Sequence, residues 1–138
     1  MQNQYLENTF GLKGKAVFIT GSARGIGLAI ATALGRAGAT VVINDLKEDS
    51  CAQAVDKLQN EGVVATSVCC DVSDYSSVQT AKSKLDQLGI QISVLVNNAG
   101  NQNRKALVDM SPDEWQQLMN VHVNGAFNCT QTFLPDMV

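Results

Sequence analysis

The stretch that decides the fold is Lys15-Ala16-Val17-Phe18-Ile19-Thr20-Gly21-Ser22-Ala23-Arg24-Gly25-Ile26-Gly27. Residues 15–20 are a short apolar run that ends at glycine, which predicts a buried strand. From residue 25 to 37 apolar residues recur at helical spacing, and Gly38 predicts the end of that helix. The glycines between the two elements permit a tight turn and let a phosphate approach the helix N-terminus. The stretch therefore predicts a strand, a phosphate-binding turn and a helix.

The same alternation continues along the rest of the chain. Apolar runs predict strands at residues 40–44, 63–69 and 92–96, and helical spacing of apolar residues predicts helices that end at Gly62 and Gly89. Short apolar strands that alternate with helices are typical of a parallel sheet with helices on both faces. We therefore expect one continuous βαβαβαβα unit without an internal linker.

The last predicted helix has the clearest start signal. It begins at Ser111-Pro112-Asp113-Glu114, which combines a capping Ser, Pro at the first helical position and Glu three residues after the cap. Helical spacing then places seven residues on one face: Trp115, Leu118, Met119, His122, Ala126, Cys129 and Phe133.

Composition limits the classes of function. The chain has 138 residues, 45% of them hydrophobic, and a net charge of −3, so it lacks the basic stripe that follows a nucleic-acid backbone. No apolar run approaches the roughly 20 residues of a membrane span, and residues 1–10 lack the pattern of a signal peptide. We therefore expect a cytoplasmic protein that binds neither nucleic acid nor membrane.

The cysteine content argues against a metal site. The four cysteines, Cys51, Cys69, Cys70 and Cys129, form no C-x-x-C pair. His122 is the one histidine of the sequence, so the ligand spacing of a zinc site is missing. Since cysteine is among the most buried residue types, we expect reduced thiols that are buried or half-buried.

Asp45 is a candidate site residue outside the glycine stretch. It lies eighteen residues after Gly27, at the tip of the second predicted strand. A carboxylate at this place accepts hydrogen bonds from both hydroxyls of an adenosine ribose and repels a 2′-phosphate. Two alternatives remain: a glycine turn without a ligand, and an Asp45 that is only an exposed turn residue.

Three further motifs follow the glycine stretch: Asp71-Val72, Asn97-Asn98-Ala99-Gly100, and Trp115 with Gly125-x-Phe127. Together with the glycine spacing T-G-x-x-x-G-x-G, they make the chain similar to the short-chain dehydrogenase/reductase family from about Leu12 onward. The resemblance implies a Rossmann-like doubly wound parallel sheet, truncated before its fifth strand. Residues 1–138 would then be a single, incomplete NAD(P)-binding domain of a homo-oligomeric oxidoreductase, which transfers hydride between a nicotinamide and an alcohol or carbonyl substrate.

The resemblance also implies a role for individual residues. The glycine stretch would hold the pyrophosphate and ribose, Asp45 the adenosine ribose, Asp71-Val72 the adenine, and the N-N-A-G motif the central part of the cofactor. These residues are Gly21, Ser22, Arg24, Gly25, Ile26, Gly27, Asp45, Asp71, Val72, Asn98, Ala99 and Gly100. Asp45 predicts NAD rather than NADP, whereas a basic residue at the place of Arg24 accompanies NADP in many members of the family.

The segment from Asn98 to Arg104 looks most like the gluconate 5-dehydrogenases, in which basic residues follow N-N-A-G. A sugar acid or polyol is therefore one candidate substrate, and Arg104 would pair with its carboxylate. The alternatives are a solvated loop arginine and a substrate of the 3-oxoacyl reductase or steroid type.

The chain departs from the family's pattern at two points. His122 occupies the position of the catalytic asparagine, which holds a water and disturbs the helix in the family. His122 either bonds a water or a backbone carbonyl, or it is a core-facing substitution. The catalytic Ser and the Tyr-x-x-x-Lys pair are absent from residues 1–138, since neither Tyr5 nor Tyr75 is followed by Lys four residues later. An alternative function is therefore a dinucleotide-binding module, or a truncated fragment, without catalysis of its own.

Overall fold

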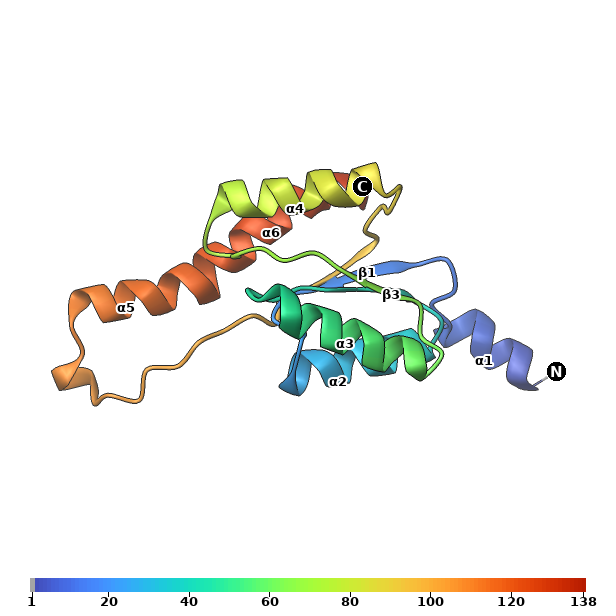
Figure 1. The fold of residues 1–138 in the computed structure, drawn as a ribbon, viewed down its shortest axis with the longest axis horizontal. Helices are drawn as coiled ribbons and strands as arrows, with labels where there is room; N and C mark the ends of the chain where they lie inside the picture. The colour runs from blue at the N-terminus through green and yellow to red at the C-terminus, as the bar shows by residue number, and fades with distance from the viewer. Residues whose placement is uncertain (1) are drawn as a thin grey trace.

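The computed structural model describes residues 2–138 as a four-stranded sheet between helices (Figure 1). The strands are β1 (Ala16–Ile19), β2 (Thr40–Ile43), β3 (Ala65–Ser67) and β4 (Val94–Val96). The helices are α1 (Gln2–Phe10), α2 (Gly25–Arg36), α3 (Glu48–Asn60), α4 (Tyr75–Gln87), α5 (Pro112–Met119) and α6 (Gly125–Phe133). Shorter turns are η1 (Leu107–Asp109), the π-helical η2 (Asn120–Asn124) and η3 (Leu134–Asp136).

All strand pairs are parallel, in the order β3-β2-β1-β4. Val17 of the central strand β1 pairs with Val41 of β2 and with Val94 of β4. Helices α2 and α3 lie on one side of the sheet, and α4 and α6 lie on the other (Figure 1). The predicted doubly wound parallel sheet is therefore confirmed, and the carboxyl ends of its strands meet at one edge.

The alternation of side chains along each strand divides the core into two layers. Val17, Ile19 and Val41 face the layer that α2 and α3 cover. Phe18 and Val42 face the other layer, where α4 and α6 pack. In that layer the rings of Phe18 and Phe133 lie with their centroids 4.6 Å apart.

Four features differ from the sequence-based expectations. Strands β3 and β4 are shorter than residues 63–69 and 92–96, the apolar runs that predicted them. Helix α1 was not predicted. In α2, Ile26 is exposed although the apolar spacing predicted it on the buried face; Ile30 and Leu34 of that predicted face do pack against the core, and the fully buried positions are Gly27 and Ala31. The last predicted helix is interrupted by the π-helical turn η2, so the single apolar face predicted for it does not exist.

None of the helices within residues 2–138 combines the length and the apolar composition needed to cross a membrane.

Candidate functional site

The site begins at the N-terminus of α2. Gly21 and Gly25 have φ angles of +61° and +58°, which glycine adopts without strain. Arg24 precedes the helix in an extended conformation and gives it no side-chain cap. Within the described part of the chain, the backbone N–H groups of residues 25–27 find no hydrogen-bond acceptor, and the first helical bond runs from Leu28 N to Arg24 O at 3.3 Å. Three free donors at the positive end of a helix form an anion-binding site.

Two glycines are required by close packing beneath this turn. A Cβ on Gly27 would lie 2.5 Å from Gly21 O and 2.7 Å from Asn98 Nδ2, and a Cβ on Gly21 would lie 2.9 Å from Ala99 Cα. At Gly25 a Cβ would meet no atom within 4 Å, so that side of the loop is open. The glycine loop is therefore packed tightly on the sheet side and free on the outer side.

Hydrogen bonds join the glycine loop to the N-N-A-G motif after β4. The buried Thr20 Oγ1 accepts from the backbone N–H groups of Asn98 and Ala99, both at 2.9 Å. In return, Asn98 Nδ2 donates to the carbonyls of Thr20 and Gly21 at 3.0 and 3.1 Å. The structure thus brings together two predicted segments that lie about 75 residues apart in sequence.

Ser22 is fully buried, and the protein itself occupies its polar groups. Its Oγ donates to Ile19 O at 2.7 Å and accepts from Asn44 N at 3.1 Å, while its backbone N–H donates to Asn44 O at 2.7 Å. Ser22 therefore connects the ends of β1 and β2 from the inside and presents no hydroxyl to the outer side of the loop.

Asp45 and Arg24 line an open cavity of about 470 Å³ beside the glycine loop. Asp45 is half-buried, and its Oδ1 accepts from the backbone N–H of Leu46 at 2.9 Å. The same cavity contains Lys47 and Lys57, so one carboxylate and three cations share it. This cavity can therefore receive a group with hydroxyls, and its charge does not by itself exclude a phosphate.

Asp71 and Val72 follow β3 but face in different directions. Asp71 is exposed, and its Oδ1 accepts from the backbone N–H and the hydroxyl of Ser73 at 2.9 and 2.7 Å. Val72 is buried against Gly125, where a Cβ would lie 2.8 Å from Val72 Cγ2. The carbonyl of Val72 accepts from Asn128 Nδ2 at 2.9 Å, so α6 fixes this loop.

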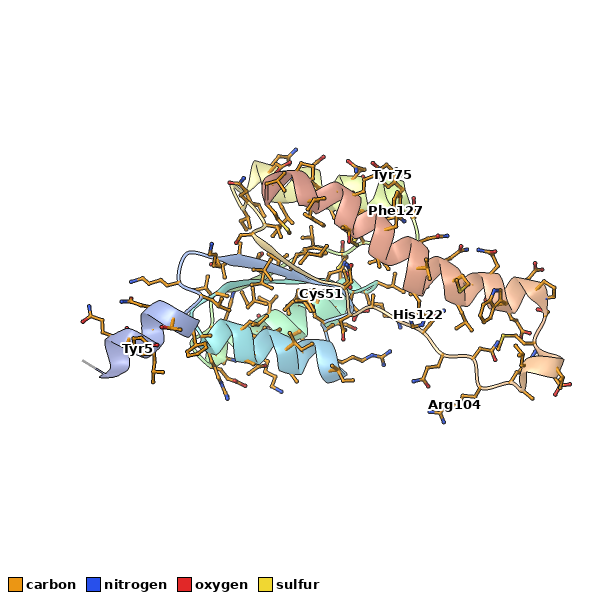
Figure 2. All side chains as sticks on the ribbon, turned by 180° about the vertical axis from the view of Figure 1, so that it is seen from behind. Tyr5, Cys51, Tyr75, Arg104, His122 and Phe127 are labelled. Carbon is orange, nitrogen blue, oxygen red and sulfur yellow. The ribbon has the colours of Figure 1, made fainter. Side chains whose placement is uncertain are left out.

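His122 lies in the π-helical turn, where the helix meets the loop that leads to Arg104 (Figure 2). It is exposed, so its interpretation as a core-facing residue is wrong: the extra residue in the turn carries it out of the buried face. Its Nε2 lies 2.8 Å from Asn101 O, to which it donates in one tautomer, and 3.2 Å from Asn101 N. The ring also packs on Gly100, where a Cβ would lie 2.6 Å from Cε1. The alternative in which His122 bonds a backbone carbonyl is confirmed.

Arg104 lies on the extended loop between β4 and α5 (Figure 2). It is exposed, and its Nε and Nη2 both donate to Gln102 Oε1 at 3.3 Å. The neighbouring Lys105 pairs instead with Glu114 at the start of α5. Arg104 is therefore free of any carboxylate partner among the described residues.

Three residues that organise the site were missing from the predicted set: Thr20, Asn44 and Asn128. Asn44 Nδ2 donates to the carbonyls of Val68 and Cys70 at 3.1 and 3.3 Å, which joins β2 to the loop that carries Asp71. The only sequence signal for Asn44 is a polar residue at the end of an apolar run, and Asn128 has no such signal because α6 contains other polar residues, whereas Thr20 opens the glycine motif itself.

Comparison with known proteins identifies the family. The family model described as short chain dehydrogenase matches residues 15–138. The chain is 35% identical over 133 residues to the 5-keto-D-gluconate 5-reductase of Escherichia coli (strain K12). The aligned region covers 96% of this chain and 52% of that relative. It is also 35% identical over 129 residues to the gluconate 5-dehydrogenase of Gluconobacter oxydans (strain 621H). This aligned region covers 94% of the chain and 50% of the relative.

Solved structures give the same result. A gluconate 5-dehydrogenase from Burkholderia cenocepacia J2315, in complex with NADP and tartrate, has a TM-score of 0.88 at 39% identity, covering 94% of this chain and 51% of that one. A 3-oxoacyl (acyl-carrier-protein) reductase from Agrobacterium tumefaciens C58, with NADP bound, has a TM-score of 0.88 at 30% identity, covering 99% of this chain and 53% of that one. The chain thus spans about half the length of the relatives it matches. From its sequence match and its fold alike, the chain belongs to the short-chain dehydrogenase family.

Proposed function

We propose that residues 1–138 form the NAD(P)-binding part of one short-chain dehydrogenase domain. The protein would transfer hydride between a nicotinamide and an alcohol or carbonyl substrate. The observation that carries this proposal is the uncapped N-terminus of α2, whose three free N–H groups lie next to the open side of Gly25. A pyrophosphate has the charge and the acceptor oxygens that such an arrangement stabilises.

The described residues fit this cofactor. Gly21, Gly25 and Gly27 would let the pyrophosphate approach the backbone, and the exposed side chains of Arg24 and Ile26 flank the same helix end. Asp45 would bind the adenosine ribose, Asp71 the adenine, and Asn98, Ala99 and Gly100 the central part of the cofactor. Ser22 and Val72 would act from inside, by holding their loops in place. The bound nicotinamide would supply or accept the hydride.

Both dinucleotides fit the charges of the Asp45 cavity. Asp45 favours NAD because its carboxylate repels a 2′-phosphate, whereas the cations Arg24, Lys47 and Lys57 attract one. The two solved relatives described above hold NADP. We therefore propose a site that accepts either cofactor, and the preference for NAD remains a prediction.

For the substrate we propose a sugar acid. Several similar proteins are named for gluconate or its keto derivatives. Arg104 supports the proposal because it is exposed and has no carboxylate partner within residues 2–138, so its planar guanidinium can exchange its bonds to Gln102 for two parallel hydrogen bonds with a substrate carboxylate. Comparing the full-length protein on gluconate, simple polyols and acyl thioesters tests this. Activity confined to thioesters would contradict it.

A second candidate is a chain that binds a dinucleotide without turnover. It is favoured by the absence of a Tyr-x-x-x-Lys pair from residues 1–138, since a tyrosine would supply the proton in this family. Tyr5 and Tyr75 lie on α1 and α4, well apart from each other (Figure 2). We therefore propose that these residues alone bind the cofactor but do not catalyse.

The four free cysteines favour a reducing compartment such as the cytoplasm.

The experiment that tests the proposed function is a calorimetric titration of the purified chain with NAD and with NADP. We expect saturable binding of at least one of them with one site per chain. An absence of binding at millimolar concentrations of both would contradict the proposal. Adenosine, which lacks the pyrophosphate, serves as the control ligand and should bind much more weakly.

A further inference from the structure

Two cysteine thiols lie in contact beside the Asp45 cavity. Cys69 Sγ and Cys51 Sγ are 3.2 Å apart, although eighteen residues separate them in the sequence. Cys51 belongs to the first turns of α3 and is fully buried, at the centre of the molecule (Figure 2). Cys69 follows β3 and is half-buried, so one member of the pair is reachable from solvent.

The other two cysteines are placed differently. Cys70 and Cys129 belong to the core layer on the opposite face of the sheet. Cys70 Sγ accepts from Asn44 Nδ2 at 3.1 Å, and burial raises the pKa of the Cys129 thiol to about 12. The chain therefore contains one thiol pair in contact and two thiols held inside the core.

We propose that Cys51 and Cys69 form a reversible intramolecular disulfide when the protein meets a peroxide. The partly exposed Cys69 reacts first: its sulfur attacks one oxygen of hydrogen peroxide, forms a sulfenic acid and releases water. The Cys51 sulfur then attacks the Cys69 sulfur, the S–S bond forms, and the hydroxyl leaves as a second water. Two thiols and one peroxide thus give one disulfide and two waters, and a dithiol reductant returns both thiols.

The geometry of the pair favours this order of events. Burial raises the pKa of the Cys51 thiol to about 12, and the hydrogen bond to Cys69 and the nearby charge of Asp45 act in the same direction. Cys51 is therefore protonated before its attack, and because only a thiolate is nucleophilic, its proton passes to the hydroxyl that leaves the Cys69 sulfenic acid as water. A disulfide needs the sulfurs about 2.05 Å apart, so they must approach each other by roughly 1 Å.

This approach would disturb the cofactor cavity. Cys51 N donates to Lys47 O at 3.1 Å, and the backbone amide of Asp45 lies beside the Cys51 sulfur and partly opposes the rise in its pKa. The segment from Asp45 to Lys47 lines the cavity and is joined to Cys51 by this hydrogen bond, so we expect a shift of Cys51 to reach it. Oxidation should therefore weaken dinucleotide binding, a consequence that rests on the proposed function.

Counting thiols tests the disulfide on the whole chain. The reduced protein is treated with hydrogen peroxide, denatured, alkylated and measured by mass spectrometry. We expect two alkylated cysteines in place of four, a linked peptide that joins Cys51 to Cys69, and recovery of four after dithiothreitol. Cys129→Ala should give the same disulfide, whereas Cys69→Ser should give none. Four alkylated cysteines after treatment, or a different linkage, would overturn the proposal.

The effect on binding is measured separately. Reduced and oxidised protein are titrated with NAD and NADP, and we expect the oxidised form to bind at least threefold more weakly until dithiothreitol is added. A disulfide that leaves the affinity unchanged would overturn the effect on binding. If the reduced protein binds neither dinucleotide, the proposed function and this effect both fail, and the thiol count still decides the disulfide.

Discussion

At the scale of single residues, the charges around the Asp45 cavity predict cofactor choice. Asp45→Asn keeps the shape and removes the repulsion of a 2′-phosphate. We expect its NADP affinity to rise relative to NAD by roughly tenfold, because such a repulsion amounts to about 1–2 kcal/mol near a surface. Arg24→Ala should change the ratio in the opposite direction. Titrations of both variants check this, and an unchanged ratio in Asp45→Asn would show that Asp45 does not face the ribose.

His122 and Gly100 form a second residue-scale prediction. Gly100→Ala places a methyl group 2.6 Å from Cε1 of His122, so the ring must leave and lose its bond to Asn101. We expect a loss of about 0.5–1.5 kcal/mol in the free energy of unfolding, the value of one hydrogen bond. His122→Ala removes the obstacle, so the double variant should be less destabilised than the sum of the single ones. Strict additivity in urea denaturation would contradict the contact.

Individual residues also show how far sequence reasoning reaches. Gly21 and Gly27 could be predicted as site residues from the sequence. Tight packing permits only glycine at these two positions, so the glycines recur at a fixed spacing. The burial of Ser22 could not be read in the same way. A serine in a glycine loop has the same sequence signal whether its hydroxyl points outward or, as here, to Ile19 O.

At the scale of elements, the start of α5 predicts a pH dependence. Ser111 and Glu114 form the predicted capping box, and Lys105 pairs with Glu114. The hydrogen bond from Lys105, followed by that from the Ser111 backbone, lowers the pKa of Glu114 from 4.5 to about 2. The carboxylate therefore stabilises the fold above about pH 4.5, and this contribution is lost as the pH falls toward 2.

We therefore expect Glu114→Gln to lower Tm at pH 6 and to have a smaller effect at pH 2, close to the pKa of Glu114, where a large part of the wild-type carboxyl is protonated. Thermal unfolding of both proteins between these pH values measures the difference. Gln116→Glu, on the exposed side of α5, is the control for an added rather than a removed charge. A Tm difference independent of pH would contradict the role of the Lys105–Glu114 pair.

Helices and strands could be predicted where a single spacing of apolar residues holds over their whole length. Strands β1 and β2 are buried on both faces, so their continuous apolar runs identified them within one residue at each end. The last helix was harder, because the π-helical turn at residues 120–124 inserts one extra residue per turn. A search with a constant helical period therefore places His122 and Phe133 on one face, although only Phe133 is buried.

At the scale of the whole molecule, α5, η2 and α6 present large apolar side chains to solvent. Trp115 and Phe127 are 50% and 60% exposed, and Val123 and Leu134 are also exposed; Figure 2 places Phe127 on the outer side of α6. Within residues 2–138, β4 pairs with β1 alone and has no strand on its other edge. Apolar patches and open strand edges favour association.

We therefore predict that the chain self-associates at micromolar concentrations and that Phe127→Glu shifts it toward the monomer. Light scattering after size-exclusion chromatography measures the mass. Val64→Glu, which places the same charge at an equally exposed apolar position between α3 and β3, is the control and should leave the mass unchanged. A wild-type chain that remains monomeric at all concentrations would contradict the prediction.

The central claim, that α2 binds a pyrophosphate at its N-terminus, is tested most directly at Ile26. This side chain is 76% exposed in the first turn of α2, so Asp is accommodated there and favours the helix by about 0.3–1 kcal/mol. The same negative charge would repel the phosphates. We predict that Ile26→Asp folds with an equal or higher Tm and binds NAD and NADP at least tenfold more weakly than Ile26→Asn, the neutral control of the same size. Equal affinity of the Asp and Asn variants would contradict the claim.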